Sequence, residues 1–76
     1  MMEIKQKIKS AISRVLDITQ VPDDISQMNC EKWDSLGHLN LIIEIESDFD
    51  ISIEPEEIAE MKTLLDIERI VNCKIN

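Results

Sequence analysis

A serine follows an aspartate at positions 34 and 35, and a strongly apolar run begins directly after it. From Trp33 the stretch reads WDSLGHLNLIIEIE. Aspartate is one of the preferred residues before the first turn of a helix, which predicts that a helix begins here with the Ser35 hydroxyl at its N-terminus. The partial positive charge and the free N–H groups of such an end favour a phosphate. Ser35 is therefore a candidate attachment point for a phosphate-linked group.

Two other roles for Ser35 have to be compared with attachment. A hydrolytic nucleophile needs a base and an oxyanion hole, but His38 lies on the same helix as Ser35 and the sequence has no GxSxG elbow. We therefore reject hydrolysis. A plain helix-start residue needs no further explanation, because serine is common at that position. The residues alone leave the attachment point and the plain helix start open.

Length and charge limit the class of protein. The chain has 76 residues, with 16 acidic and 8 basic side chains and a formal net charge of −8, which predicts one domain over residues 1–76. A domain of this size buries about 60% of its unfolded surface, so a deep catalytic pocket is not expected. The negative charge disfavours nucleic acid and anionic membranes, and it favours basic partners. We expect a monomer.

The sequence contains neither a signal-peptide pattern nor an apolar stretch long enough to cross a bilayer, which predicts a cytoplasmic protein without membrane insertion. Its two cysteines, Cys30 and Cys73, lack CxxC spacing and the density of a secreted disulfide scaffold. We expect two reduced, partly buried thiols.

The acidic run that begins at Asp48 starts like a calcium-binding loop, with oxygen-bearing side chains at alternating positions. The pattern then fails, because Ile53 stands where a turn glycine is needed and Ala59 stands where a bidentate glutamate belongs. We expect no metal site.

Apolar residues recur at three- and four-residue steps in several segments, and capping residues place the ends of the predicted helices. We expect a first helix over residues 2–17, a second from the N-cap Asp34 to about Phe49, a short third that begins within residues 54–57, and a last one that begins at Thr63. Residues 18–33 mix helix breakers with aliphatic side chains, which predicts an ordered loop packed on the helices. The predicted fold is all-α: a small antiparallel four-helix bundle with three main helices and one short helix.

The second predicted helix has two apolar faces. At about 100° per residue, one face carries Leu41, Ile42, Ile45 and Phe49, and the nearly opposite face carries Leu36, Leu39 and Ile43. A helix in a small bundle needs only one buried face, so the second predicts an exposed strip for a partner. Polar neighbours surround this strip: Asn40, Glu44, Glu46 and Ser47. The alternative is that the loop of residues 18–33 covers the strip.

The stretch WDSLGHLNLIIEIESDFDISI, followed by EEIAEMKTLLDIERIV, resembles the acyl carrier protein family over essentially the whole chain. In that family the serine of an Asp-Ser-Leu motif bears phosphopantetheine. The resemblance implies that Ser35 carries this arm through a phosphodiester, with Asp34 and Leu36 as the flanking motif residues. It also implies that the thiol of the arm holds an acyl group as a thioester, and that the protein is a non-catalytic carrier.

The resemblance further implies which partners the carrier meets. These are a phosphopantetheinyl transferase and acyl or aminoacyl synthetases, transferases and synthases with basic docking patches. The positions that match docking residues of the family are Leu36, Leu39, Ile43 and Glu46. The opposite face, with Leu41, Ile45 and Phe49, would line the core where a short acyl chain shelters.

Departures from the family pattern bear on the pathway. Members that serve bulk fatty acid synthesis usually have an acid directly after the motif and a glutamate three residues later, where this chain has Gly37 and Asn40. Trp33 and His38 resemble discrete carriers of specialised pathways, such as polyketide, aminoacyl or surface-polysaccharide modification. We expect His38 to be a packed histidine with satisfied nitrogens. Fatty acid synthesis, a peptidyl or aminoacyl carrier, and an unmodified acidic adaptor remain the alternatives.

Overall fold

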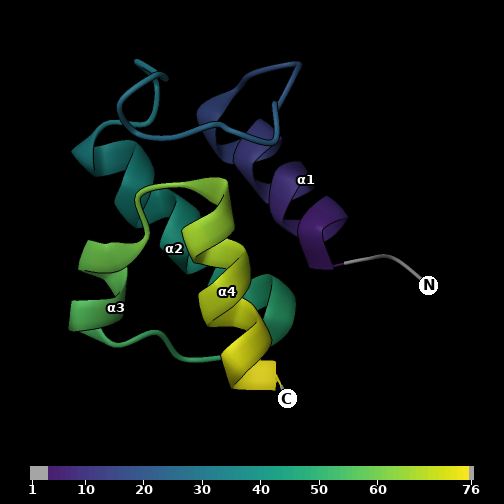
Figure 1. The fold of residues 1–76 in the computed structure, drawn as a ribbon, viewed down its shortest axis with the longest axis vertical. Coiled ribbons are helices and arrows are strands. Elements are labelled where there is room, and N and C mark those ends of the chain that lie inside the picture. Colours follow the sequence, from purple (N-terminus) through teal and green to yellow (C-terminus); the bar gives the residue numbers. More distant parts are fainter. Residues whose placement is uncertain (1–3, 76) are drawn as a thin grey trace.

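The computed structural model describes residues 4–75, and these residues form four helices (Figure 1). The helices are α1 (Ile4–Leu16), α2 (Ser35–Phe49), α3 (Pro55–Glu60) and α4 (Leu64–Ile75). Helix α1 packs against both α2 and α4, and no strand forms within the described range. This confirms the expected all-α bundle of three main helices and one short helix. No helix between residues 4 and 75 combines the length and the apolarity needed to cross a bilayer.

Two aspartates in the left-handed conformation end the long helices α1 and α2. Asp17 and Asp50 both have a φ of 54°, a conformation that an aspartate tolerates better than most residues do. The backbone N–H of Asp50 donates to the carbonyl of Glu46, which closes the last turn of α2. The observed end of α1 agrees with the predicted helix, although the predicted residues 2 and 3 lie outside the described range.

Short-range polar contacts begin the last two helices. In front of α3, the backbone N–H of Glu54 donates to Oε1 of Glu57 at 2.8 Å. At the start of α4, Thr63 Oγ1 accepts from the N–H of Asp66 at 3.0 Å, as expected of its capping position. The Asp66 carboxylate, however, accepts from the N–H of Lys62 at 3.3 Å rather than from that of Thr63, so the reciprocal bond is displaced by one residue.

The loop of residues 18–33 is ordered and packs on the helices, as predicted. It carries two buried side chains, Ile25 and Trp33. Its middle pairs with the segment between α3 and α4: Gln27 N–H donates to the Lys62 carbonyl at 2.9 Å, and Leu64 N–H donates to the Ile25 carbonyl at 3.1 Å. These bonds join the loop to the connection between α3 and α4, and Figure 1 shows the loop crossing above α1 and α2.

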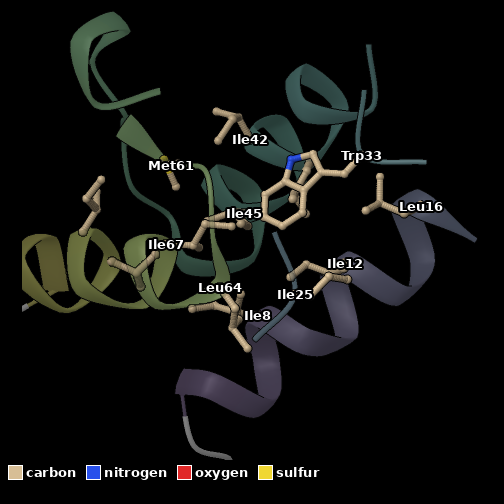
Figure 2. Packing of buried hydrophobic residues seen from close by; sticks show 14 of the residues in the cluster. Ile8, Ile12, Leu16, Ile25, Trp33, Ile42, Ile45, Met61, Leu64 and Ile67 are labelled. Carbon is tan, nitrogen blue, oxygen red and sulfur yellow. The ribbon is translucent and has the colours of Figure 1, made fainter. Parts of the chain in front are cut away.

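Side chains from every long helix and from the long loop form one apolar core (Figure 2). Trp33 is its largest member and is only 1% exposed. From α2, the core takes Leu41, Ile42 and Ile45, which were predicted to face inward. Phe49, predicted to share that face, is only half-buried and packs at the rim of the core, with Lys7 Nζ 4.7 Å from its ring centroid. The prediction that Phe49 is a buried core residue was therefore wrong, because its side chain is only partly buried.

Candidate functional site

The start of α2 holds the serine in a fixed and open position. Asp34 precedes the helix with extended backbone, and its Oδ1 accepts from the N–H of Gly37 at 2.8 Å. Its carbonyl accepts from the N–H of His38 at 2.8 Å, which closes the first turn. Ser35 is the first residue of this 15-residue helix and is exposed. The predicted N-cap at Asp34 is confirmed.

Gly37 allows the preceding loop to approach the first turn of α2. A Cβ atom at this position would lie 2.7 Å from the Lys32 carbonyl oxygen and 3.0 Å from a methyl carbon of Leu16. The first distance is too short for any side chain, and the neighbouring atom belongs to the backbone. From the sequence, Gly37 was noted only because carriers of bulk fatty acid synthesis usually have an acid at this position. The structure gives a steric reason for the glycine.

Two buried hydrogen bonds connect the side chains that flank the serine motif. The Trp33 indole N–H donates to His38 Nδ1 at 2.9 Å, and His38 Nε2 lies 2.8 Å from the Ile58 carbonyl oxygen. His38 is buried, and both of its ring nitrogens have partners, so the expectation of a packed and satisfied histidine is confirmed. These two hydrogen bonds connect the long loop, α2 and α3. The sequence placed Trp33 and His38 near the motif but did not predict their bond.

The second apolar face of α2 is exposed. Leu36, Leu39 and Ile43 are 68%, 53% and 63% exposed. The loop of residues 18–33 therefore does not cover this docking strip, and the alternative that it does is wrong. Large aliphatic side chains that are this open on one helix face are typical of a surface that another molecule covers. Their role in docking stays a prediction.

The acidic side chains of α2 have partners within the protein. Nη2 of Arg14 in α1 lies 2.9 Å from the Glu44 carboxylate and 2.8 Å from the Asp48 carboxylate. These bonds to Glu44 and Asp48 raise the pKa of Arg14. Glu46 turns its Oε2 to the backbone N–H of Ile53, at 2.9 Å. The sequence could not predict these contacts, because they depend on how α1 and the following loop pack against α2.

Helix α3 rests on the bundle through few contacts. It has no buried residue, although Ile58 packs in part against the core. The Lys74 ammonium lies 2.8 Å from Glu57 Oε1, and this bond lowers the pKa of Glu57. No pocket opens into the interior across the described residues. Shelter for an acyl chain among Leu41 and Ile45 is therefore not preformed.

The cysteines and acidic clusters add no second site to the described range. Both cysteines are free thiols. Cys30 is half-buried as expected, but Cys73 is exposed, so the expected partial burial was wrong for Cys73. Within residues 4–75, no three or more histidine, cysteine or acidic side chains are grouped in a way that could hold a metal ion.

Comparison with known proteins identifies the class to which this fold and site belong. Residues 6–71 match the family model described as "Phosphopantetheine attachment site", so the chain belongs to this family of carrier proteins. The structure is also similar to that of the holo acyl carrier protein from Geobacter metallireducens, with a TM-score of 0.86 and 25% sequence identity over 97% of this chain and 87% of that one. The resemblance to acyl carrier proteins is confirmed, and with it a covalently bound phosphopantetheine as cofactor.

Proposed function

We propose that Ser35 is the residue that carries the phosphopantetheine arm and that the protein presents a thioester-bound acyl group to other enzymes. The observation that supports this most directly is the exposed Ser35 hydroxyl at the N-terminus of the 15-residue helix α2. Attachment joins Ser35 Oγ to the phosphate of the arm with loss of the hydroxyl proton, and adenosine 3′,5′-bisphosphate leaves from coenzyme A.

The residues around Ser35 fit such a group. A phosphodiester bears one negative charge, and the N-terminal end of a helix stabilises that charge by up to about 1 kcal/mol at an exposed site. The Asp34 carboxylate is held on the first turn of α2, because its Oδ1 accepts from the N–H of Gly37. Leu36 leaves an open apolar surface beside the attachment point. In this proposal, Asp34 positions the first turn and Leu36 contacts the modifying enzyme.

The docking strip of Leu36, Leu39 and Ile43 follows the serine along the same helix. Enzymes that act on the arm have to reach Ser35 and its cargo, so a surface that begins beside the attachment point suits them. We assign the contact with the phosphopantetheinyl transferase and with acyl-handling enzymes to this strip. The large exposed fraction of all three side chains supports the assignment.

We further propose that the carrier serves a specialised pathway with a short or polar cargo. Two observations support this. No pocket among the described residues would shelter a long acyl chain. The positions that are acidic in bulk fatty acid carriers hold Gly37 and Asn40, and Trp33 and His38, which flank the motif, are joined by a buried hydrogen bond.

Incubation of the apo protein with coenzyme A and a phosphopantetheinyl transferase tests the attachment. Intact mass should increase by one phosphopantetheine in the wild type and in Ser10→Ala, which removes an exposed hydroxyl on α1. Ser35→Ala should show no increase and should keep its helical circular dichroism, because exposed substitutions change stability by about 0.5 kcal/mol or less. Addition to Ser35→Ala, or no addition to the wild type with several transferases, would refute the carrier site.

The cargo proposal has its own measurement. The arm can be loaded with an acetyl or an octanoyl group and the methyl NMR signals of Leu41 and Ile45 recorded. These side chains are fully buried. Neither cargo should shift their signals, whereas signals of Leu36 should respond to both. A large shift of the Ile45 methyls with octanoyl alone would mean that the core opens for long chains and would favour fatty acid synthesis.

A further inference from the structure

The chain contains one histidine and one tryptophan, and the two rings meet in the interior of the protein. Histidine is the side chain that ordinarily changes charge between about pH 5 and pH 8. Carboxylates ordinarily titrate below this range, and thiols and amines titrate near its upper end or above it. His38 is therefore the side chain through which the folded protein can respond to mild acid.

The two hydrogen bonds of the His38 ring respond to an added proton in opposite ways. Nδ1 accepts from the Trp33 indole N–H at 2.9 Å, so a proton on Nδ1 would leave two donors facing each other. Nε2 lies 2.8 Å from the Ile58 carbonyl oxygen and can donate to it whether the ring is neutral or charged. A charged donor forms the stronger bond. Proton uptake therefore breaks the bond to the loop and strengthens the bond to α3.

No carboxylate forms an ion pair with His38 among residues 4–75. The charged side chains of the surrounding elements are bonded elsewhere: Asp34 to the N–H of Gly37, Lys32 to the carbonyl of Asp17, Glu57 to Lys74, and Arg14 to Glu44 and Asp48. Three further carboxylates of the loop and of α3 are exposed: Glu31, Glu56 and Glu60. No ion pair thus replaces the lost bond to Trp33.

The loop side of this contact is the part that can yield. His38 belongs to the 15-residue helix α2, and its N–H donates to the Asp34 carbonyl at 2.8 Å. Trp33 lies outside the helix, with its N–H on the Cys30 carbonyl at 3.1 Å. Its indole packs in the core (Figure 2). Release of the indole nitrogen therefore loosens the residue that directly precedes Asp34 and Ser35.

We propose that His38 is a pH-sensitive latch on the loop that leads into the Asp-Ser-Leu motif. The neutral ring holds the Trp33 indole and, with it, the N-cap residue Asp34. Uptake of a proton from solvent at Nδ1 releases the indole and loosens residues 33–35, while α3 stays bonded through Nε2. Ser35 is held most firmly at neutral pH and becomes more mobile in mild acid. The latch is a property of the unmodified chain and does not depend on attachment at Ser35.

The first experiment follows the unmodified protein by proton–nitrogen NMR from about pH 7 to about pH 5, where histidine titrates. With one tryptophan and one histidine in the chain, the indole and imidazole signals are assigned without a variant. The indole N–H signal should move upfield as its hydrogen bond is lost, with the same midpoint as the imidazole signals. The heteronuclear NOE of the Trp33 and Asp34 amides should fall, whereas that of Ile58 in α3 should not.

Fluorescence gives a second measurement, because the chain has one tryptophan and no tyrosine. Quenching of Trp33 by acrylamide should increase about twofold or more over the same pH range as the loop opens locally. His38→Asn keeps an acceptor oxygen close to the position of Nδ1 but cannot titrate, so its indole signal and its quenching should not change. Asn40→Ala, on the exposed side of the same helix, should titrate like the wild type.

Several outcomes would overturn the latch. They are imidazole signals that stay constant down to about pH 5, a titrating imidazole with an unchanged indole signal, and the same indole change in His38→Asn. Equal loosening of Ile58, or loss of helical circular dichroism in the wild type, would show that α3 or the whole fold responds and would also overturn it. If His38→Asn does not fold, the wild-type titration decides alone. Absence of phosphopantetheine addition at Ser35 would refute the proposed function and leave the latch unaffected.

Discussion

The indole N–H of Trp33 donates to Nδ1 of His38 across 2.9 Å in the interior of the protein. An indole nitrogen only donates, so Nδ1 must act as the acceptor. His38 Nε2 lies 2.8 Å from the Ile58 carbonyl oxygen, which only accepts, so the ring proton must be on Nε2. The neutral ring with its proton on Nε2 is therefore the form that satisfies both contacts. This one side chain connects the loop before the carrier motif with α2 and with the weakly held helix α3.

Trp33→Phe should lower the free energy of unfolding by about 1 to 3 kcal/mol, because it leaves Nδ1 of a buried imidazole without a donor. Some of the loss comes from the smaller ring, so a second substitution is needed to isolate the bond. His38→Leu removes the acceptor and, in the double variant, leaves no unpaired group between the two positions. Urea unfolding followed by circular dichroism should give a double variant that is more stable than the sum of the single losses predicts. Additivity within about 0.5 kcal/mol would exclude a bond of this kind.

Gly37→Ala should destabilise the protein although alanine favours a helix. The helix propensity of alanine over glycine is worth about 1 kcal/mol. Against this, the new Cβ would lie 2.7 Å from the Lys32 carbonyl oxygen, a backbone atom that cannot rotate away. Steric overpacking of this type costs about 1 to 3 kcal/mol, so the net effect should be a lower melting temperature.

Asn40→Ala is the control for Gly37→Ala, since it lies one turn further along the exposed side of the same helix. It should change stability by about 0.5 kcal/mol or less. If Gly37→Ala instead melted above the wild type, the loop would yield easily at Lys32. Steric crowding at Lys32 would then not explain why position 37 is a glycine.

Sequence reasoning located the helices and the exposed strip because both depend on short-range signals. The period of the apolar residues in α2 separates Leu41 and Ile45 from Leu39 and Ile43 without any knowledge of the other helices. The hydroxyl of Thr63 and the carboxylate of Asp34 act on amides three residues away. Such contacts can be predicted from a few neighbouring residues.

The charge distribution of α2 could not be predicted in the same way. Arg14 bonds to Glu44 and Asp48, which lie 30 and 34 residues further along the chain. Which acids it meets depends on the rotation of α1 against α2, and the sequence does not specify that angle. For the same reason the position of Phe49 at the rim of the core became clear only from the packing.

The ion pair between Lys74 and Glu57 should make the attachment of α3 sensitive to acid. The bond to Lys74 lowers the pKa of Glu57 from its ordinary value of 4.5. A lowered carboxylate pKa means that the pair stabilises the fold above pH 4.5 and that this stabilisation is lost as the pH falls through the folded-state pKa. Melting temperatures of the wild type and of Glu57→Gln should therefore differ most at neutral pH and converge in acid. A constant difference across the titration would show that the charge of Glu57 does not contribute.

Glu46 tests whether a residue that the family resemblance assigns to docking has a structural role in this chain. Its carboxylate accepts from the partly buried N–H of Ile53 at 2.9 Å and so holds the connection between α2 and α3. Glu46→Ala should lower the free energy of unfolding by about 1 to 3 kcal/mol, because the N–H loses its acceptor. Glu46→Gln keeps a carbonyl oxygen for this bond and removes only the charge, so it should stay close to wild type in a urea melt. If Glu46 acts through the fold, the rate of phosphopantetheine transfer per folded molecule should be unchanged in both variants. A stable Glu46→Gln protein whose transfer is slower at low salt, and recovers relative to wild type at high salt, would instead assign Glu46 to the docking surface.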